Sequence, residues 1–246
     1  ACWALGAVAS PVHHLAAGAD VERILDQVEP TVVVSAPDLP AAKAPGAVQV
    51  RGDGGFEELL RSDPHTTIDA RPGDVAVVMF TSGSTGGPKG VLLTHQGLVY
   101  KARTLLGVHG LGRDDVVLVP SPMAHIAGLS NAVMLPGVGG FRAVMMDRWD
   151  AGRALDLIRD EGVTFMMGPP TYFQMMMAAP GFSSEAVATM RLISCGGAGV
   201  TPAFARAASE AFGAVVKRTY GSTEAPAVTT WHAGDPLERA WTHDGR

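Results

Sequence analysis

Mostly apolar runs of four or five residues alternate along this chain with longer segments of helical periodicity. The runs at residues 116–119 and 163–167 are too short for helices and typical of buried strands. Segments 151–161 and 202–212 carry apolar residues three or four positions apart, which predicts helices between the strands. This alternation predicts an α/β fold built on a mostly parallel sheet.

The same pattern extends over the rest of the chain. Asp20 stands where it can cap a helix whose apolar residues follow on one face. Thr201 directly before Pro202 is typical of another helix start. Further strands are expected at residues 31–35, 74–80, 91–94, 141–146, 191–194 and 214–218, and further helices at about residues 95–107, near 126–135 and from Pro170.

The glycine-rich and charged segment at residues 110–115 is the best candidate for a boundary between subdomains. It predicts a first α/β subdomain at residues 1–112 and a second at residues 113–246. With 47% hydrophobic residues among 246, the chain can bury one large core or two packed ones. Because it begins at Ala1 and ends in a loop-like segment, we interpret it as an internal piece of a longer protein.

The most distinctive segment directly follows the predicted strand at residues 74–80. It reads Thr81-Ser82-Gly83-Ser84-Thr85-Gly86-Gly87-Pro88-Lys89-Gly90. Glycines let backbone N–H groups approach a ligand, and consecutive N–H groups form a concavity that binds anions. The hydroxyls add donors, and Lys89 adds a compact positive charge suited to phosphate. The segment therefore predicts a loop that binds polyphosphate.

This loop differs from two common nucleotide-binding motifs. A Walker A motif that began at Gly83 would need glycine where Pro88 stands and serine or threonine where Gly90 stands. The segment also does not read Gly-x-Gly-x-x-Gly, the motif of dinucleotide-binding folds. A Walker-type NTPase is therefore the weakest of the nucleotide-binding alternatives.

Three further segments stand where strands are expected to end, which is where open α/β sheets bind ligands. Residues 220–224 combine an aromatic ring, a hydroxyl and a carboxylate suited to a hard cation. The small residues at 194–199 suit either a bound ligand or a tight strand-to-helix turn. His125 lies on the apolar segment 122–128, where a role in the core or at the surface is the alternative to a ligand contact.

Together these segments resemble the adenylate-forming superfamily of acyl- and aryl-CoA synthetases, luciferases and peptide-synthetase adenylation domains. Residues 81–90 resemble its phosphate loop, residues 220–224 its second core motif, and residues 122–128 the Pro-Met-x-His-x-x-Gly segment of acyl-CoA synthetases. The resemblance runs from about residue 1 to residue 240. It implies an adenylation-domain fold of two stacked, mostly parallel sheets flanked by helices. That fold would be cut at both ends and would lack the C-terminal domain that carries a lysine.

The resemblance also implies a reaction and a set of residue roles. A carboxylic acid reacts with ATP to give an acyl-adenylate and pyrophosphate, and the thiol of coenzyme A then takes the acyl group. The implied catalytic residues are Lys89, Thr223 at the α-phosphate, Glu224 as the Mg²⁺ ligand, and His125 at the acyl end. The implied nucleotide-binding residues are Thr81, Ser82, Gly83, Ser84, Thr85, Gly86, Gly87, Lys89, Gly197, Ala198, Tyr220, Gly221, Ser222, Thr223 and Glu224. Together these roles imply that the loop near residue 85 and the Glu224 carboxylate converge on one triphosphate.

The implied substrate is a plain carboxylic acid, whether fatty, alicyclic or aryl. Amino-acid-activating members commonly carry an aspartate near the acyl segment, whereas no acidic residue occurs from Ser121 to Leu135. The ribose-binding Thr-Gly-Asp of the superfamily does not follow Glu224 in this chain. We therefore expect the fragment by itself to be weakly active or inactive.

Composition narrows the class of partner. A net charge of −5 without a cluster of Lys and Arg argues against nucleic acid. No apolar run reaches the ~18 residues of a membrane span. Cys2 and Cys195 are too few and too distant for a disulfide framework, which favours the reducing cytoplasm. The oligomeric state stays open, a homo-oligomer included.

Three alternatives to a CoA ligase stay open at this point. The acyl group could pass to the thiol of a carrier protein instead of coenzyme A. The adenylate could instead be oxidised, as it is in luciferases. The chain could also be a non-catalytic nucleotide-binding relative or a degraded coding remnant.

Overall fold

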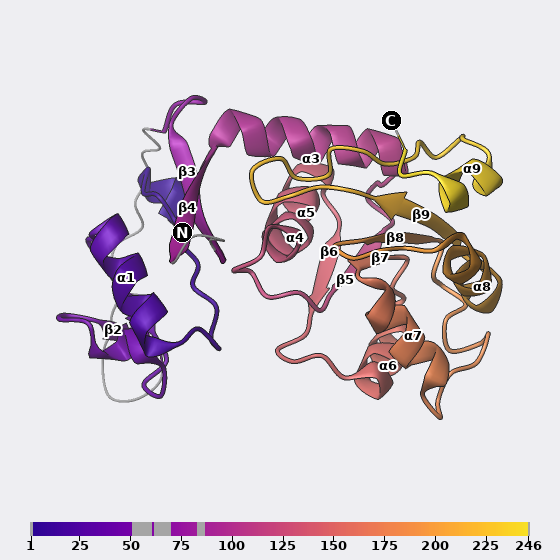
Figure 1. Ribbon diagram of the computed structural model, residues 1–246, viewed down its shortest axis with the longest axis horizontal. Coiled ribbons are helices and arrows are strands. Elements are labelled where there is room, and N and C mark those ends of the chain that lie inside the picture. Colours follow the sequence, from indigo (N-terminus) through magenta and orange to yellow (C-terminus); the bar gives the residue numbers. More distant parts are fainter. Residues whose placement is uncertain (1, 51–60, 62–69, 83–86, 246) are drawn as a thin grey trace. The chain divides into compact units, whose positions relative to one another are not determined.

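The computed structural model describes residues 2–50, 61, 70–82 and 87–245 (Figure 1). Its contacts divide the chain into two units, Ala1–His95 and Gln96–Arg246. The boundary expected from the sequence, after residue 112, lies inside the second of these units.

The first unit combines short helices with a β-hairpin. Its elements are η1 (Cys2–Leu5), α1 (Gly18–Val28), β1 (Val34–Ser35), η2 (Pro40–Lys43), β2 (Val48–Gln49), β3 (Val75–Ser82) and β4 (Pro88–Thr94). The expectation that Asp20 caps α1 is wrong, because Ala17 is the N-cap and Asp20 lies in the first turn. A carboxylate there still interacts favourably with the positive end of the helix dipole. The strand expected at residues 31–35 is only two residues long.

Strands β3 and β4 pair antiparallel, in contrast to the parallel pairing that the alternation of strands and helices favoured. The chain between Ser82 and Pro88 is too short for a parallel crossover, which needs a dozen or more residues. Ala76, Val77 and Met79 of β3 are fully buried. The hairpin therefore has a firmly packed first strand that leads directly to the predicted phosphate loop.

The second unit is built on a five-stranded parallel sheet with the strand order β6-β5-β7-β8-β9. The strands are β5 (Val116–Val119), β6 (Arg142–Met145), β7 (Phe165–Gly168), β8 (Leu192–Gly196) and β9 (Val215–Thr219). The helices are α3 (His95–His109, whose first residue belongs to the first unit), α4 (Ile126–Leu129), the π-helical turn η3 (Ser130–Met134), α5 (Leu135–Gly139), α6 (Ala151–Glu161), α7 (Pro170–Ala178), α8 (Pro202–Phe212) and α9 (Leu237–Thr242).

One face of this sheet packs on α6, α7 and α8, which Figure 1 shows gathered on the same side. The core on that face takes Leu118, Met166, Ile193 and Val216, one from each of four strands, together with the apolar stripes of the helices. The other face meets α3, where Phe165 contacts the His109 ring at a centroid distance of 5.7 Å. Alternate residues of each strand thus serve two apolar layers, as expected for a sheet buried on both faces.

The α/β fold class with a mostly parallel sheet is confirmed. Strand 116–119 and helices 151–161 and 202–212 have the bounds expected from their apolar periodicity. Thr201 caps α8 as predicted, accepting a hydrogen bond from the Phe204 N–H at 3.2 Å. Among the described residues, no helix combines the length and apolar character that a membrane crossing requires.

Candidate active site

The strand order of the second unit creates a switch point between β5 and β7. The chain leaves β5 toward β6 on one side and later returns to β7 on the other side. The connections at the carboxyl ends of β5 and β7 therefore lead in opposite directions, which opens a crevice above the sheet. Ligands bind at this position in open α/β sheets.

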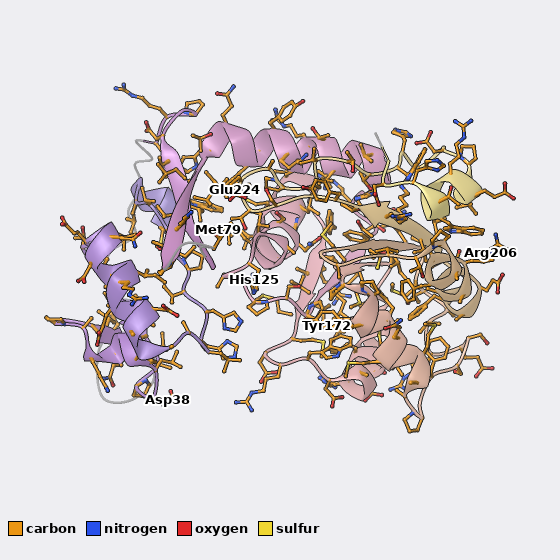
Figure 2. The ribbon with its side chains drawn as sticks, viewed as in Figure 1. Asp38, Met79, His125, Tyr172, Arg206 and Glu224 are labelled. Atoms are coloured by element: carbon orange, nitrogen blue, oxygen red, sulfur yellow. The ribbon has the colours of Figure 1, made fainter. Side chains whose placement is uncertain are left out.

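A cavity of about 420 Å³ lies at these carboxyl ends. Connections after four strands line it: Ser121 and His125 after β5, Pro169 after β7, Gly197 after β8, and Gly221, Ser222 and Thr223 after β9. His125, labelled in Figure 2, follows β5 in the chain and directly precedes α4. Five of the predicted site residues, from three separate segments of the sequence, thus meet around one cavity: His125, Gly197, Gly221, Ser222 and Thr223.

The remaining predicted site residues of this unit do not line the cavity. Tyr220 has 61% of its surface exposed, and Ala198 and Glu224 are also exposed. The pKa of Glu224 lies below its ordinary value because the carboxylate accepts hydrogen bonds from its own backbone N–H and from the Ser222 hydroxyl. Glu224 therefore offers a charged, accessible carboxylate directly after the cavity-lining Thr223 (Figure 2).

The loop at residues 220–229 has a compact shape that requires glycine at position 221. Tyr220 and Thr229 exchange backbone hydrogen bonds of 3.0 and 3.1 Å, which close the loop. A Cβ added at Gly221 would lie 2.3 Å from the Ala227 nitrogen. The glycine of this motif thus serves the close approach of two backbone segments beside the cavity.

The segment that carries His125 also depends on a close approach. The His125 N–H donates to the Pro122 carbonyl at 2.9 Å, and the His125 carbonyl accepts from the Leu129 N–H at 3.0 Å. A Cβ at Gly128 would come within 2.0 Å of the Pro122 oxygen. Glycine at this position lets α4 begin directly after the turn, and His125 is the N-cap of that helix at the cavity wall.

The first unit holds the other predicted site residues on the β3–β4 hairpin. The register pairs Thr81 with Lys89 and Ser82 with Pro88, so the Thr81 and Lys89 side chains lie on one face near the tip. Lys89 is exposed, and Gly87 follows the part of the loop at residues 83–86. Gly83, Ser84, Thr85 and Gly86 lie outside the described residues. The predicted convergence of this loop with Glu224 stays a prediction.

No group of three His, Cys, Asp or Glu side chains that could hold a metal ion occurs within the described ranges. A structural metal centre needs several such ligands, but Mg²⁺ bound to substrate phosphates needs only one or two carboxylates. Glu224, charged and accessible, fits the second case.

A family model described as "AMP-binding enzyme" matches residues 1–246. The chain belongs to this AMP-binding family. Feruloyl-CoA synthase of Amycolatopsis sp is 30% identical over 92% of the chain and 46% of its own length. The medium-chain fatty-acid–CoA ligase of Escherichia coli (strain K12) is 29% identical over 73% of the chain and 32% of its own length. The chain thus spans less than half the length of these two relatives.

Solved structures of AMP-binding proteins share this fold. The ATP-bound crystal structure of MatB from Rhodopseudomonas palustris has a TM-score of 0.84 and 27% identity over 95% of the chain and 48% of its own. The inhibitor-bound N-terminal domain of FACL13 from Mycobacterium tuberculosis has the same TM-score of 0.84, with 29% identity over 98% of the chain and 63% of its own. The adenylation-domain resemblance inferred from the motifs is therefore confirmed.

The chain also contains a row of hydroxyls beside the cavity that the motifs did not single out. Ser194 Oγ lies 2.7 Å from Thr219 Oγ1, which lies 2.9 Å from Thr230 Oγ1. Thr219 lines the cavity, whereas Ser194 is fully buried inside β8. The local signal was limited to Ser194, a hydroxyl in the otherwise apolar strand β8, because Thr219 ends a strand that also contains Lys217 and Arg218. Their hydrogen bonds join β8 and the end of β9 to Thr230, which directly follows the loop at residues 220–229.

Proposed function

We propose that the protein carrying this chain activates a carboxylic acid with ATP and passes the acyl group to coenzyme A. The cavity at the carboxyl ends of four parallel strands carries this proposal, because it gathers His125, Gly197 and Thr223. These residues belong to three separate sequence motifs. The family match and the CoA-ligase names of the relatives support the same reaction.

The first step joins the acid to the nucleotide. A carboxylate oxygen attacks the α-phosphorus of ATP, the bond from that phosphorus to the bridging oxygen breaks, and pyrophosphate leaves with the electron pair. Such a step requires positioning and neutralisation of charge more than covalent help from the protein. Thr223 would donate to an α-phosphate oxygen, and Gly197 with Tyr220 would flank the adenine. Mg²⁺ held by Glu224 would neutralise phosphate charge.

The second step transfers the acyl group. The thiolate sulfur of coenzyme A attacks the acyl carbon, a thioester forms, and AMP leaves with the oxygen it gained. His125 would stand beside the carboxylate through both steps. In the first unit, Thr81 and Lys89, on one face of the hairpin, would contact the β- and γ-phosphates.

The cavity lining favours an acid whose acyl group is uncharged. Within the described residues, the lining contains no Asp, Glu, Lys or Arg side chain. A second carboxylate or an ammonium on the substrate would therefore lose water without gaining an opposite charge there, which is costly. Leu105, Ile126 and Met167 instead supply apolar surface.

ATP–pyrophosphate exchange tests the proposal. The protein carrying this chain is incubated with ATP, labelled pyrophosphate and a panel of fatty, alicyclic and aryl acids. We expect label in ATP that depends on the acid, and acyl-CoA as product after addition of coenzyme A. No acid-dependent exchange with any acid would contradict acid activation. Exchange without acyl-CoA would retain the first step and overturn the assignment of coenzyme A as acceptor.

A further inference from the structure

The loop at residues 220–229 contains a backbone conformation that its own sequence disfavours. Ala227 has φ of +50°, in the left-handed region that residues with a Cβ rarely adopt. The other described residue of this kind, Glu29, is the C-cap of α1, where such a conformation is common. Ala227 lies instead inside a loop, beside the cavity. Such a conformation persists where surrounding contacts hold it in place.

Lys101 of α3 supplies such a contact. Its Nζ donates to the Ala227 carbonyl oxygen at 2.6 Å, although the two residues are 126 positions apart. Hydrogen bonds from a charged donor are shorter and stronger than those between neutral groups. The Lys101 side chain is half-buried, and this burial lowers its pKa.

The contact lies next to the cavity. Leu105 follows Lys101 by one helical turn, so the two side chains share a face of α3, and Leu105 lines the cavity. Pro226 and Ala227 line the same cavity from the loop. Helix α3 therefore forms part of the wall with one residue and holds the loop with the residue one turn earlier.

A shift of Ala227 would be transmitted directly to the motif at residues 220–224. The Ala227 nitrogen lies so close to Gly221 that a Cβ there would be 2.3 Å away. The Ser222 N–H also donates to the Ala225 carbonyl at 3.1 Å. The positions of residues 221–223 therefore depend on the position of Ala227.

We propose that Lys101 is a positioning residue that holds the loop at residues 220–229 in the shape in which Gly221, Ser222 and Thr223 line the cavity. It acts through the Ala227 carbonyl, and Lys101 is not among the described residues that line the cavity. That it holds the loop follows from contacts within the second unit. That it thereby affects nucleotide use rests on the proposed function.

Hydrogen exchange measured by mass spectrometry, without nucleotide, tests the holding of the loop. Lys101→Met keeps the length of the side chain and removes the donor. We expect exchange at the Tyr220, Ser222 and Thr229 amides to become about tenfold faster, the scale of a lost hydrogen bond from a charged group. Arg103→Met, at an exposed position on the same helix, is the matched control and is expected to leave exchange unchanged.

A second variant separates backbone strain from general damage. Ala227→Gly removes the Cβ that disfavours the left-handed conformation. Combined with Lys101→Met, it is expected to return most of the lost protection. The proposal is overturned if Lys101→Met leaves the loop unchanged. It is equally overturned if exchange quickens throughout residues 96–245, because Lys101 would then stabilise the whole unit.

The effect on nucleotide use has its own readout. In ATP–pyrophosphate exchange, Lys101→Met is expected to raise KM for ATP several-fold, and Ala227→Gly to reverse most of that rise. Faster loop exchange with an unchanged KM and kcat would overturn the functional part of the proposal. Should the protein show no exchange reaction at all, the proposed function fails while the hydrogen-exchange result still decides whether Lys101 holds the loop.

Discussion

The two ends of the five-stranded sheet are built from different chemistry. At the carboxyl ends, glycines and hydroxyls surround a cavity, and the described lining has no Asp, Glu, Lys or Arg. At the amino ends, Asp115, Thr164 and Arg191 stand directly before β5, β7 and β8 and bind one another. The Arg191 guanidinium donates to both Asp115 oxygens, at 2.8 and 2.6 Å, and the Thr164 hydroxyl donates to Asp115 at 2.6 Å.

This contrast suggests different roles for the two ends, with the amino end serving stability and the carboxyl end serving function. The amino-end cluster joins three strands and pairs the Asp115 carboxylate with Arg191 and Thr164, so its hydrogen bonds stabilise the sheet. The carboxyl end leaves small residues and hydroxyls facing open space, where a ligand can satisfy them. Variants at the carboxyl end should therefore change activity more than stability, and variants at the amino end the reverse.

The largest expected effect is at Glu224. Glu224→Gln keeps the shape of the side chain and removes the charge proposed to bind Mg²⁺. We expect kcat of ATP–pyrophosphate exchange to fall by about 100-fold, the scale of losing one electrostatic stabiliser of the transition state. Thermal unfolding should be unchanged, because the side chain is exposed. Glu210→Gln on α8 is the matched control. An equal loss of kcat in both variants would show that Glu224 has no specific role in the site.

Gly221→Ala tests the close approach that shapes the carboxyl end. The new Cβ would lie 2.3 Å from the Ala227 nitrogen, so the loop has to shift. Overpacking of this kind costs about 1–3 kcal/mol, and we expect kcat/KM for ATP to fall by about tenfold or more. Gly137→Ala, where the added Cβ meets nothing within 4 Å, is the control and should retain full activity. Full activity of Gly221→Ala would show that the loop geometry is not required.

Asp115→Asn should affect stability rather than activity. Burial by itself would raise the pKa of Asp115, but hydrogen bonds from Arg191, Thr164 and the Gly112 N–H outweigh it and hold the pKa below its ordinary value. Losing a buried ion-pair partner costs about 3–5 kcal/mol, which we reduce to about 2 kcal/mol because Arg191 is 43% exposed. We expect Tm at pH 7 to fall by about 4–8 °C while KM for ATP stays unchanged.

The same variant has a pH signature with a defined sign. Because the folded pKa of Asp115 is lowered, its stabilisation is present above the unfolded pKa of about 3.9 and is lost as pH falls toward the folded value. The difference in Tm between wild type and Asp115→Asn should therefore narrow below about pH 4. A difference that widened on acidification would contradict the role given to this carboxylate.

The smallest expected effect is at the exposed amino end of β6. Arg142 pairs with Glu161 at 2.8 Å, with side chains that are 61% and 40% exposed. Exposed pairs contribute about 0–1 kcal/mol, so Arg142→Ala should lower Tm by no more than a few degrees and leave kcat unchanged. Thermal unfolding and an activity assay check this. A fall in Tm as large as that of Asp115→Asn would contradict the expectation that the exposed pair contributes less to stability than the buried one.

The sequence predicted the parts that depend on local order. Strand 116–119 and helices 151–161 and 202–212 have the expected bounds, because their apolar spacing and caps lie within the elements themselves. The pairing of β3 with β4 was missed, since periodicity shows that a strand exists and not which strand it joins. The cap of α1 was misplaced because Asp20 suits the first turn as well as the N-cap.

For the candidate site, motifs supplied residues but not their arrangement. Residues 122–128, 194–199 and 220–224 were each ambiguous alone, and the strand order shows that their connections share one cavity. The hydroxyls of Ser194 and Thr219 and the contact from Lys101 to Ala227 were missed because each joins residues 25 or more positions apart. No local pattern encodes such pairs.

The carboxyl end of this sheet is the place where we propose that the nucleotide binds. Photolabelling with an azidoadenosine triphosphate, followed by peptide mapping, tests it most directly. We predict label on peptides that contain residues 196–198 or 220–223, removed by an excess of ATP. Label that ATP displaces only from other peptides, such as those around Asp115 and Arg191, would contradict the account.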